Sequence, residues 1–249
     1  MQQYFIDEQI ELNQKIAMND NQSHHIKNVM RMKENTIVKV VDVDHQGFLG
    51  KIIYEDKQVY VLPYEAMANN DDGQVTLILA QALIKKDKWD FLLQKTSELG
   101  VDEIIPFECK RCVVKSKDEK SGKKLQRWQM ILKEASEQCK RNTIPIIQEV
   151  CDFKALSHIE ADLKIIAYED ASASSEHLID VLEANQDVKS ICMVVGCEGG
   201  FDLEEVKYLQ QHGFVRVSLG NRILRAETAA MSLVNTIGFY YDMIKRKKD

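Results

Sequence analysis

The pattern of hydrophobic and polar positions divides the chain into two parts. Up to about residue 70, short segments rich in β-branched and aromatic residues alternate with turn residues, which predicts strands at 4–6, 36–42, 47–54 and 58–62. A short helix is expected over about 23–30, with Ser23 as its N-cap. Pro63 and the polar run at 69–73 predict a boundary. We therefore expect a small β-barrel domain at 1–71 and a second domain at 72–249.

Longer strand and helix patterns alternate in the second part. Strands are predicted at 75–83, 101–107, 163–168 and 191–195, and one more short strand ends before Gly220. Apolar stripes at helical spacing predict helices at 86–99, closed by Gly100, and at 123–141, 175–184 and 226–244. A further helix should begin after Asp202, an N-cap with Glu205 at the capping-box position, and end at Gln211. This alternation predicts an α/β fold with a mostly parallel sheet.

Two glycine-marked turns in the last third give the strongest functional signal. The first, Gly196 to Gly200, follows the strand that ends at Val195, and the second contains Gly220 and precedes the final helix. Glycines let a ligand approach backbone N–H and C=O groups, and open α/β sheets hold ligands at the carboxyl ends of strands. Either turn alone is also typical of an ordinary strand-to-helix connection. Together they are surrounded by polar candidates for a site: Glu198, Arg222, Arg225, Glu227 and Thr228.

The composition, 45% hydrophobic and 29% charged over 249 residues, is that of a soluble globular protein. The acidic start lacks a signal-peptide core, and no apolar run reaches the roughly 18 residues of a membrane span, so we expect a cytoplasmic protein with no membrane partner. Six cysteines in such a chain indicate reduced thiols. Cys109 and Cys112 have CxxC spacing, but without a second CxxC or a nearby His pair we predict structural cysteines and no metal.

The charge is unevenly distributed along the chain. The whole chain carries −6, yet residues 108–142 hold 11 Lys and Arg against five Asp and Glu, a local net charge of +6. The tail Lys245–Lys248 adds a second basic cluster. Segregated basic stretches are compatible with binding to a phosphate backbone. A solvated helix face and a loose tail explain the charges equally well.

Three motifs resemble the RsmE family, bacterial SPOUT-class methyltransferases that methylate N3 of a uridine in 16S ribosomal RNA. Residues 195–201 and 218–229 resemble its two signature loops, and residues 134–141 resemble its Glu-Ala-x-Glu-Gln-x-x-Arg motif. The resemblance extends over essentially the whole chain. The chain has Cys197 where the family usually has proline, and Asn221 and Ala226 where it often has proline and threonine. Cys197 lacks the fixed φ of proline, which predicts a less rigid loop.

The resemblance implies a fold, a cofactor and partners. It implies a PUA-like barrel before a SPOUT domain with a trefoil knot, which is an exception to the usual unknotted topology. It also implies S-adenosyl-L-methionine as methyl donor, 16S rRNA within the assembled small subunit as substrate, and a homodimer whose active sites form across the interface. Two alternatives stay open: a SPOUT methyltransferase with another RNA target, and a non-catalytic RNA-binding assembly factor. A nicotinamide-dependent dehydrogenase is disfavoured because no G-x-G-x-x-G opens a helix near the first strand.

The resemblance also implies site residues. Arg225 is our first choice for steadying the uridine anion, because arginine stays charged and binds oxygen bidentately. Glu227 or Glu198 would be the base, with the choice between them open, and Gln138 and Arg141 would act on the partner's cofactor. The cofactor would be bound by Val195, Gly196, Glu198, Gly199, Gly200, Leu219, Gly220, Ile223, Leu224, Thr228 and Ala229. RNA would be contacted by His24, His25, Arg31, Lys33, Lys85, Lys88, Lys95 and Arg111.

Overall fold

The computed structural model describes residues 1–68, 73, 75–115, 121–168 and 176–244. The chain divides into two compact units. The first comprises Met1–Asp72 together with Ser136–Thr143, and the second comprises Gly73–Ala135 and Ile144–Asp249. The predicted domain boundary falls between residues 71 and 72, which lie outside the described residues. None of the helices in the described ranges is long and apolar enough to cross a membrane.

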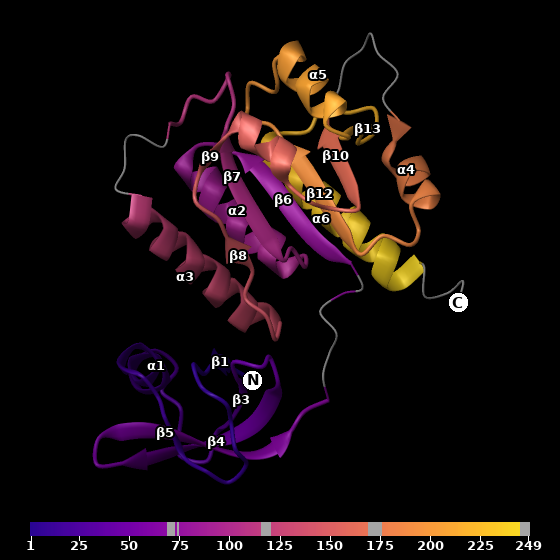
Figure 1. The fold of residues 1–249 in the computed structure, drawn as a ribbon. Helices are drawn as coiled ribbons and strands as arrows, with labels where there is room; N and C mark the ends of the chain where they lie inside the picture. Colours follow the sequence, from indigo (N-terminus) through magenta and orange to yellow (C-terminus); the bar gives the residue numbers. More distant parts are fainter. Residues whose placement is uncertain (69–72, 74, 116–120, 169–175, 245–249) are drawn as a thin grey trace. The chain divides into compact units, whose positions relative to one another are not determined.

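A single curled, five-stranded sheet forms the half-barrel of the first unit, in the order β1-β3-β4-β5-β2 (Figure 1). β1 pairs with β3 in parallel, and the other pairs are antiparallel. Its core consists of alternate strand residues such as Val38, Val40, Ile52, Val59 and Val61, together with Ile26 from the helical segment. The elements are β1 (Gln3–Phe5), β2 (Ile16–Ala17), α1 (Asp20–His24), the π-helical η1 (His25–Val29), β3 (Ile37–Val41), β4 (Gly47–Glu55) and β5 (Gln58–Ala66).

Two local predictions for this unit were wrong. The short helix starts earlier than expected, because Asn19 is its N-cap and forms a capping box with Gln22, whereas the Ser23 hydroxyl donates to the Met18 carbonyl. Pro63 does not end β5 but lies inside it, opposite Gly50, where the register between β4 and β5 shifts. A proline is tolerated there because a bulge removes the need for a ladder donor.

The segment Ser136–Thr143 is held in the first unit by two buried polar side chains. The Lys39 ammonium donates to Asn142 Oδ1 at 2.6 Å and to the Lys140 carbonyl at 3.0 Å, and Gln3 Nε2 donates to the Arg141 carbonyl at 2.6 Å. Helix α3 (Ser121–Cys139) ends within this segment, because Lys140 takes a positive φ of 71°. The helix predicted over 123–141 therefore ends before Arg141, and the prediction was wrong at this end.

The second unit is built on a sheet whose described strand pairs are all parallel, in the order β11-β13-β10-β12-β6-β7-β8 with β9 beside β7. The predicted parallel α/β fold is confirmed. The central strand β12 is apolar and buried from Ile191 to Val195, as expected for a strand covered on both faces. The strands are β6 (Thr76–Ala82), β7 (Glu103–Glu108), β8 (Ile146–Ile147), β9 (Cys151–Asp152), β10 (Leu163–Ala167), β11 (Glu176–His177), β12 (Ser190–Val195) and β13 (Val215–Ser218).

Helices α2 and α6 pack against each other behind the sheet in the view of Figure 1. α2 ends in a Schellman motif: Gly100 has a φ of 100°, its N–H donates to Ser97, and the Val101 N–H donates to Thr96. Trp128 of α3 packs on Trp89 of α2 with ring centroids 5.0 Å apart. The remaining helices are α2 (Lys86–Glu98), η3 (Phe153–His158), α4 (Leu178–Ala184), α5 (Leu203–Gln211), α6 (Ala226–Phe239) and the π-helical η4 (Tyr240–Ile244).

Several boundaries in the second unit differ from the prediction. The long final helix is α-helical only to Phe239 and then widens into the π-helix η4, and the helix predicted to begin at residue 175 begins at Leu178 after the short strand β11. β8, β9 and η3 were not predicted. The basic tail Lys245–Lys248 and the side chain of Ile244 lie outside the described residues, and the trefoil knot stays a prediction.

Candidate functional site

A cleft of about 780 Å³ lies where the carboxyl ends of β10, β12 and β13 meet. Because the three strands are parallel neighbours, the loops that follow them emerge at one edge of the sheet. The two predicted glycine turns follow β12 and β13, and both contribute to the cleft wall. The lining is completed by the start of α6 and by two cationic side chains: Lys88 and Arg111.

The first glycine turn is fixed from below by close packing. A Cβ on Gly196 would meet the Phe201 ring at 3.1 Å, so a larger residue would push that ring away. Phe201 in turn stacks on Phe107 of β7, with centroids 6.3 Å apart. Gln81, fully buried on β6, donates from Nε2 to the Gly196 carbonyl at 3.2 Å. Gln81 therefore supports the turn from within the sheet.

Charged groups at the cleft form a small network around Lys88. Its ammonium lies 3.3 Å from Glu227 Oε1 and 3.8 Å from Glu198 Oε1. Glu198 also accepts from the Lys85 backbone N–H at 3.4 Å. Glu227 is buried, whereas Glu198 lines the cleft. The two carboxylates predicted as alternative bases therefore share one cation.

A second set of contacts ties the first glycine turn to the turn after β7. Arg111 Nη1 donates to the Gly199 carbonyl at 3.1 Å. The buried Glu205 carboxylate accepts from two backbone N–H groups, those of Lys110 and Asp202, at 2.8 Å each. Asp202 is the N-cap of α5 and completes the predicted capping box with Glu205. The hydrogen bond from the Glu204 backbone N–H and the nearby Lys110 ammonium lower the pKa of the Asp202 carboxyl.

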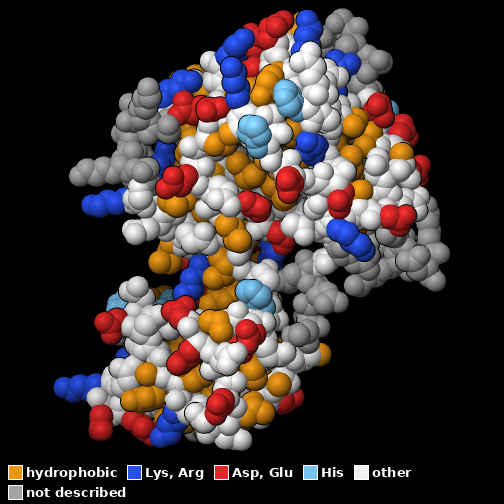
Figure 2. All heavy atoms as spheres, in the orientation of Figure 1, with side chains coloured by type: hydrophobic (Ala, Val, Ile, Leu, Met, Phe, Trp, Pro, Cys, Tyr) orange, Lys and Arg blue, Asp and Glu red, His pale blue; other side chains and the backbone are white. Residues whose placement is uncertain are grey.

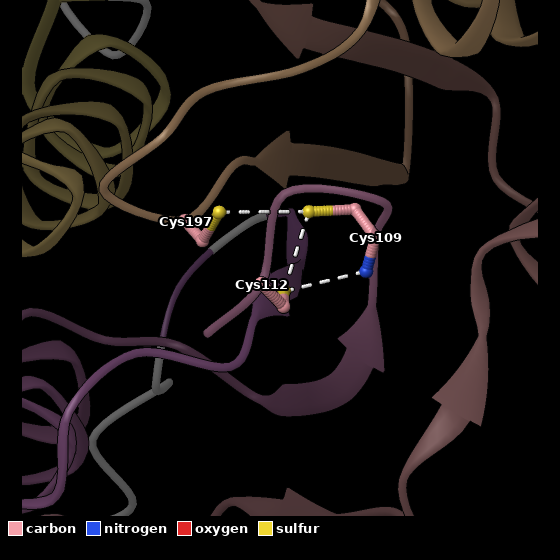
Figure 3. Close-up of side chains that lie close together, drawn as sticks. All are labelled: Cys109, Cys112 and Cys197. Carbon is pink, nitrogen blue, oxygen red and sulfur yellow. Dashed lines mark hydrogen bonds between the residues drawn. The ribbon is translucent and has the colours of Figure 1, made fainter. Parts of the chain in front are cut away.

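Three cysteines meet between the same two turns (Figure 3). Cys109 Sγ lies 3.3 Å from Cys112 Sγ and 3.7 Å from Cys197 Sγ, and all three side chains are buried. Hydrogen bonds from Cys109 and Cys112 lower the pKa of the Cys197 thiol well below its usual range. The bonds with Cys109 and Cys197, and then burial, raise the pKa of Cys112. The CxxC pair thus has a third thiol beside it that the sequence alone did not place there.

Most of the predicted cofactor-binding residues line the cleft, and so does Arg225. Gly220, on the second glycine turn, and Thr228, on α6, are not among the described residues that line the cleft. Glu227 is buried behind Lys88. The lining residues among the predictions are Val195, Gly196, Glu198, Gly199, Gly200, Leu219, Ile223, Leu224, Arg225 and Ala229.

The residues predicted to act on the partner's cofactor or to contact RNA are distributed over both units. Gln138 and Arg141 belong to the segment Ser136–Thr143 of the first unit, with Gln138 exposed and Arg141 buried. His25 Nδ1 forms a hydrogen bond with the Tyr4 hydroxyl at 3.0 Å, whereas His24, Arg31 and Lys33 are exposed. In the second unit Lys85 is exposed and Lys95 pairs with Glu98, while Lys88 and Arg111 line the cleft. Positive and negative side chains are interspersed over the described surface seen in Figure 2.

Some cleft residues were not predicted. Ala167 is the last residue of β10 and Tyr168 follows it. Val217 lies in β13, and Cys197 and Phe201 belong to the first turn itself. The available signal was the end of β10, because a third parallel strand between two ligand-holding strands must contribute its own carboxyl end. Tyr168 is followed by polar residues without glycine, so no motif drew attention to it.

Comparisons with known proteins agree with this arrangement. A family model described as an RNA methyltransferase domain matches residues 71–238, and one described as an RNA methyltransferase PUA domain matches residues 19–63. The ribosomal RNA small subunit methyltransferase E of Bacillus subtilis (strain 168) is 34% identical over 98% of this chain and 99% of its own. The chain belongs to this methyltransferase E family, RsmE. The family predicted from the signature loops is confirmed.

Two solved structures of similar proteins carry the cofactor. A Legionella pneumophila protein in complex with bound SAM is 30% identical, with a TM-score of 0.85 over 94% of this chain and 96% of that one. A Neisseria gonorrhoeae ribosomal RNA small subunit methyltransferase E, bound to S-adenosyl methionine, is 27% identical, with a TM-score of 0.87 over 97% and 98%. Both likenesses extend over the PUA-like and the parallel-sheet parts, which confirms the predicted two-part fold class.

Proposed function

We propose that this chain transfers a methyl group from S-adenosyl-L-methionine to N3 of a uridine in 16S ribosomal RNA, during biogenesis of the small subunit. The observation that carries the proposal is the cleft at the carboxyl ends of β10, β12 and β13, walled by both signature loops. In the reaction, uridine N3 loses its proton and attacks the methyl carbon of the sulfonium. The carbon–sulfur bond breaks, and S-adenosylhomocysteine leaves. Such a displacement is catalysed chiefly by positioning.

The described residues suit this reaction in distinct ways. The cofactor would lie against the backbone of the two turns, with Ala229 and the apolar side chains of Leu219 and Leu224 around it. Arg225, exposed in the cleft, would stabilise the negative charge that forms on the uracil ring as the proton leaves. Of the two carboxylates, Glu198 lines the cleft, and we assign it as the general base that accepts the uridine N3 proton. Glu227 would hold Lys88 in place.

The remaining assignments rest on the family. We propose a homodimer in which Gln138 and Arg141 serve the partner's cofactor, since both belong to the first unit and neither lines the cleft of its own chain among the described residues. We also propose a PUA-like RNA-binding domain at 1–71, a methyltransferase domain at 72–249, and action in the cytoplasm on the assembled small subunit. The reaction itself uses no metal. The prediction that the chain binds none is taken up again below.

The test is methyl transfer to small subunits that lack the modification, followed by mass spectrometry of the nucleosides. Arg225→Ala should lower kcat about 100-fold or more, because it removes a positioned charge from the transition state. Arg222→Ala is the matched control: Arg222 is exposed on the same turn, outside the described cleft lining, and its loss should leave kcat within about threefold. Equal losses in the two variants would remove Arg225 from the mechanism.

A second pair of variants tests which carboxylate accepts the uridine N3 proton. Glu198→Gln should lower kcat, whereas Glu227→Gln should act mainly on KM. The opposite result would assign the base to Glu227. If wild type binds S-adenosylhomocysteine but methylates no uridine N3 in 16S rRNA, another RNA target would be favoured. If it binds RNA but no cofactor, the non-catalytic assembly factor would be favoured.

A further inference from the structure

Three thiols from two distant segments converge at one buried point. Cys109 and Cys112 lie on the turn after β7, and Cys197 lies on the turn after β12, two strands away in the sheet. Their sulfur atoms all lie within 4.8 Å of one another, and each side chain is at most 6% exposed. Figure 3 shows the three side chains directed toward a common point. Apolar packing alone does not require three sulfurs to be brought so close together.

The spacing of the sulfurs fits a tetrahedral metal ion. Zinc–sulfur bonds of about 2.3 Å at tetrahedral angles place two sulfurs about 3.8 Å apart. The distance from Cys109 Sγ to Cys197 Sγ is 3.7 Å, and that to Cys112 Sγ is 3.3 Å. The first distance already matches, and the second requires a shift of about half an ångström.

The surroundings also favour thiolate ligands. The Cys109 backbone N–H donates to Cys112 Sγ at 3.3 Å, a bond that stabilises negative charge on sulfur. Arg111 stands between the two cysteines of the turn, and the Lys115 ammonium bonds the Cys109 carbonyl at 3.4 Å. Lys115 also lies 3.7 Å from the Glu108 carboxylate, so the backbone N–H is the contact that favours a thiolate here.

We propose that Cys109, Cys112 and Cys197 bind one Zn²⁺ ion through their three thiolates, with the fourth position open to water. Thiolates select soft or borderline ions, and three sulfurs with an open position suit zinc. The site joins the turn after β7 to the turn that lines the cleft, so the ion would fix the first glycine turn from behind. Its role is structural, because it ties two turns together and the proposed methyl transfer uses none of the three thiols.

A disulfide is the competing use of these cysteines. It joins only two sulfurs, at about 2.05 Å, and would leave the third thiol beside it without a function. It also needs an oxidant, which reducing compartments do not supply. Metal binding uses all three sulfurs and consumes no electrons, so it accounts for the whole cluster.

The experiment uses the full-length protein, reduced and stripped of metal by a chelator, and titrated with Co²⁺. One equivalent per chain should give thiolate-to-cobalt charge-transfer bands and the intense d–d bands of a tetrahedral site, and Zn²⁺ should abolish both by displacement. Cys112→Ser and Cys197→Ser should lose the charge-transfer intensity and weaken Zn²⁺ binding about 100-fold or more. Cys151→Ser, which removes a partly buried thiol outside the cluster, should bind like wild type.

The outcomes separate the alternatives. Tryptophan fluorescence of each variant shows whether the second unit is folded, because both tryptophans are buried there. Reduced wild type that gives no tetrahedral cobalt spectrum would overturn the proposal, as would a spectrum that persists in both cluster variants. Loss of two free thiols in air without metal uptake would assign a disulfide instead. Metal binding is measured without RNA or cofactor, so its failure would leave the proposed methyl transfer untouched.

Discussion

The buried carboxylate of Glu205 offers a sharp test of how the cleft is held together. Its two oxygens accept one backbone N–H from each of two segments, Lys110 on the turn after β7 and Asp202 at the start of α5. The side chain is only 4% exposed, so water cannot replace a lost acceptor. Glu205→Gln preserves the size of the side chain but turns one acceptor into an NH₂ group, which then faces a backbone N–H.

The expected cost follows from these two bonds. A hydrogen bond to a charged group contributes about 1.5–3 kcal/mol, and a buried donor left without a partner costs about 1–3 kcal/mol. Glutamine retains one of the two bonds, so we expect the free energy of unfolding of the second unit to fall by about 2 kcal/mol. For a protein of this size, that corresponds to a decrease in Tm of about 4–8 °C.

The assay is urea and thermal unfolding followed by tryptophan fluorescence. Trp89 and Trp128, the two tryptophans of the chain, are both buried in the second unit, so the signal reports on that unit alone. Glu204→Gln is the matched control, because Glu204 precedes Glu205 on α5 and its side chain is 72% exposed beside Lys207. Its replacement should change the free energy of unfolding by less than about 0.5 kcal/mol.

The result that would refute the reasoning is equal stability of the two variants. It would mean that the turn after β7 and the start of α5 do not depend on their shared carboxylate. A loss confined to Glu205→Gln, together with weaker binding of S-adenosylhomocysteine, would connect this contact to the shape of the cleft.

Two further changes test the first unit and the acid sensitivity of α5. Replacing Arg31 and Lys33 with alanine should weaken binding to 16S rRNA in filter assays. The slope of log K against log salt concentration should fall in magnitude by about one for each lost phosphate contact. An unchanged slope would exclude both residues from the RNA interface. The Asp202 carboxyl, whose pKa is lowered in the fold, contributes stability above its ordinary pKa that is lost as the pH falls through the lowered value. Asp202→Asn keeps a capping oxygen but removes the charge. The variant should therefore be less stable than wild type at neutral pH, and the two should converge in acid. A pH-independent difference in urea unfolding would contradict this assignment.

Elements with a strong local pattern could be predicted from the sequence. β12 is a continuous apolar run, and the capping box of Asp202 and Glu205 is complete within four residues. Two-residue strands such as β8 and β9 show no periodicity, so the sequence did not reveal them. Asn19 was missed although Gln22 follows it at capping-box spacing, because serine is also a favoured N-cap residue and Ser23 lies close by.

Other departures depended on tertiary contacts that no local pattern encodes. The end of α3 is set by Lys140 at positive φ, a conformation unusual for lysine, and by the contacts that Lys39 and Gln3 make with the residues around it. A helical wheel therefore extended the helix through Arg141. Pro63 was interpreted as a boundary because the bulge that accommodates it depends on the opposite strand.

The site divides in the same way. The glycine turns were found because the carboxyl ends of parallel strands meet at one edge of the sheet whatever the side chains are. The side chains that fix these turns come from elsewhere: Gln81 from β6, and Arg111 from the turn after β7. Distances of 115 and 88 residues separate these donors from the carbonyls they bind, and no spacing rule spans such distances.

The cysteines make the consequence concrete. The CxxC pair was judged incomplete as a metal site because ligands were sought nearby in the sequence, whereas the third thiol, Cys197, lies 88 residues beyond Cys109. Because Cys197 lacks the fixed φ of proline, we predicted a less rigid first glycine turn. In the fold, the Cys197 sulfur packs against Cys109 on the turn after β7. The same turn contributes the Arg111 side chain, which donates to the Gly199 carbonyl, and the Lys110 N–H, which donates to Glu205. The order of this turn therefore derives from contacts across the sheet edge, so substitutions on the turn after β7 should alter the cleft as strongly as substitutions within the signature loop.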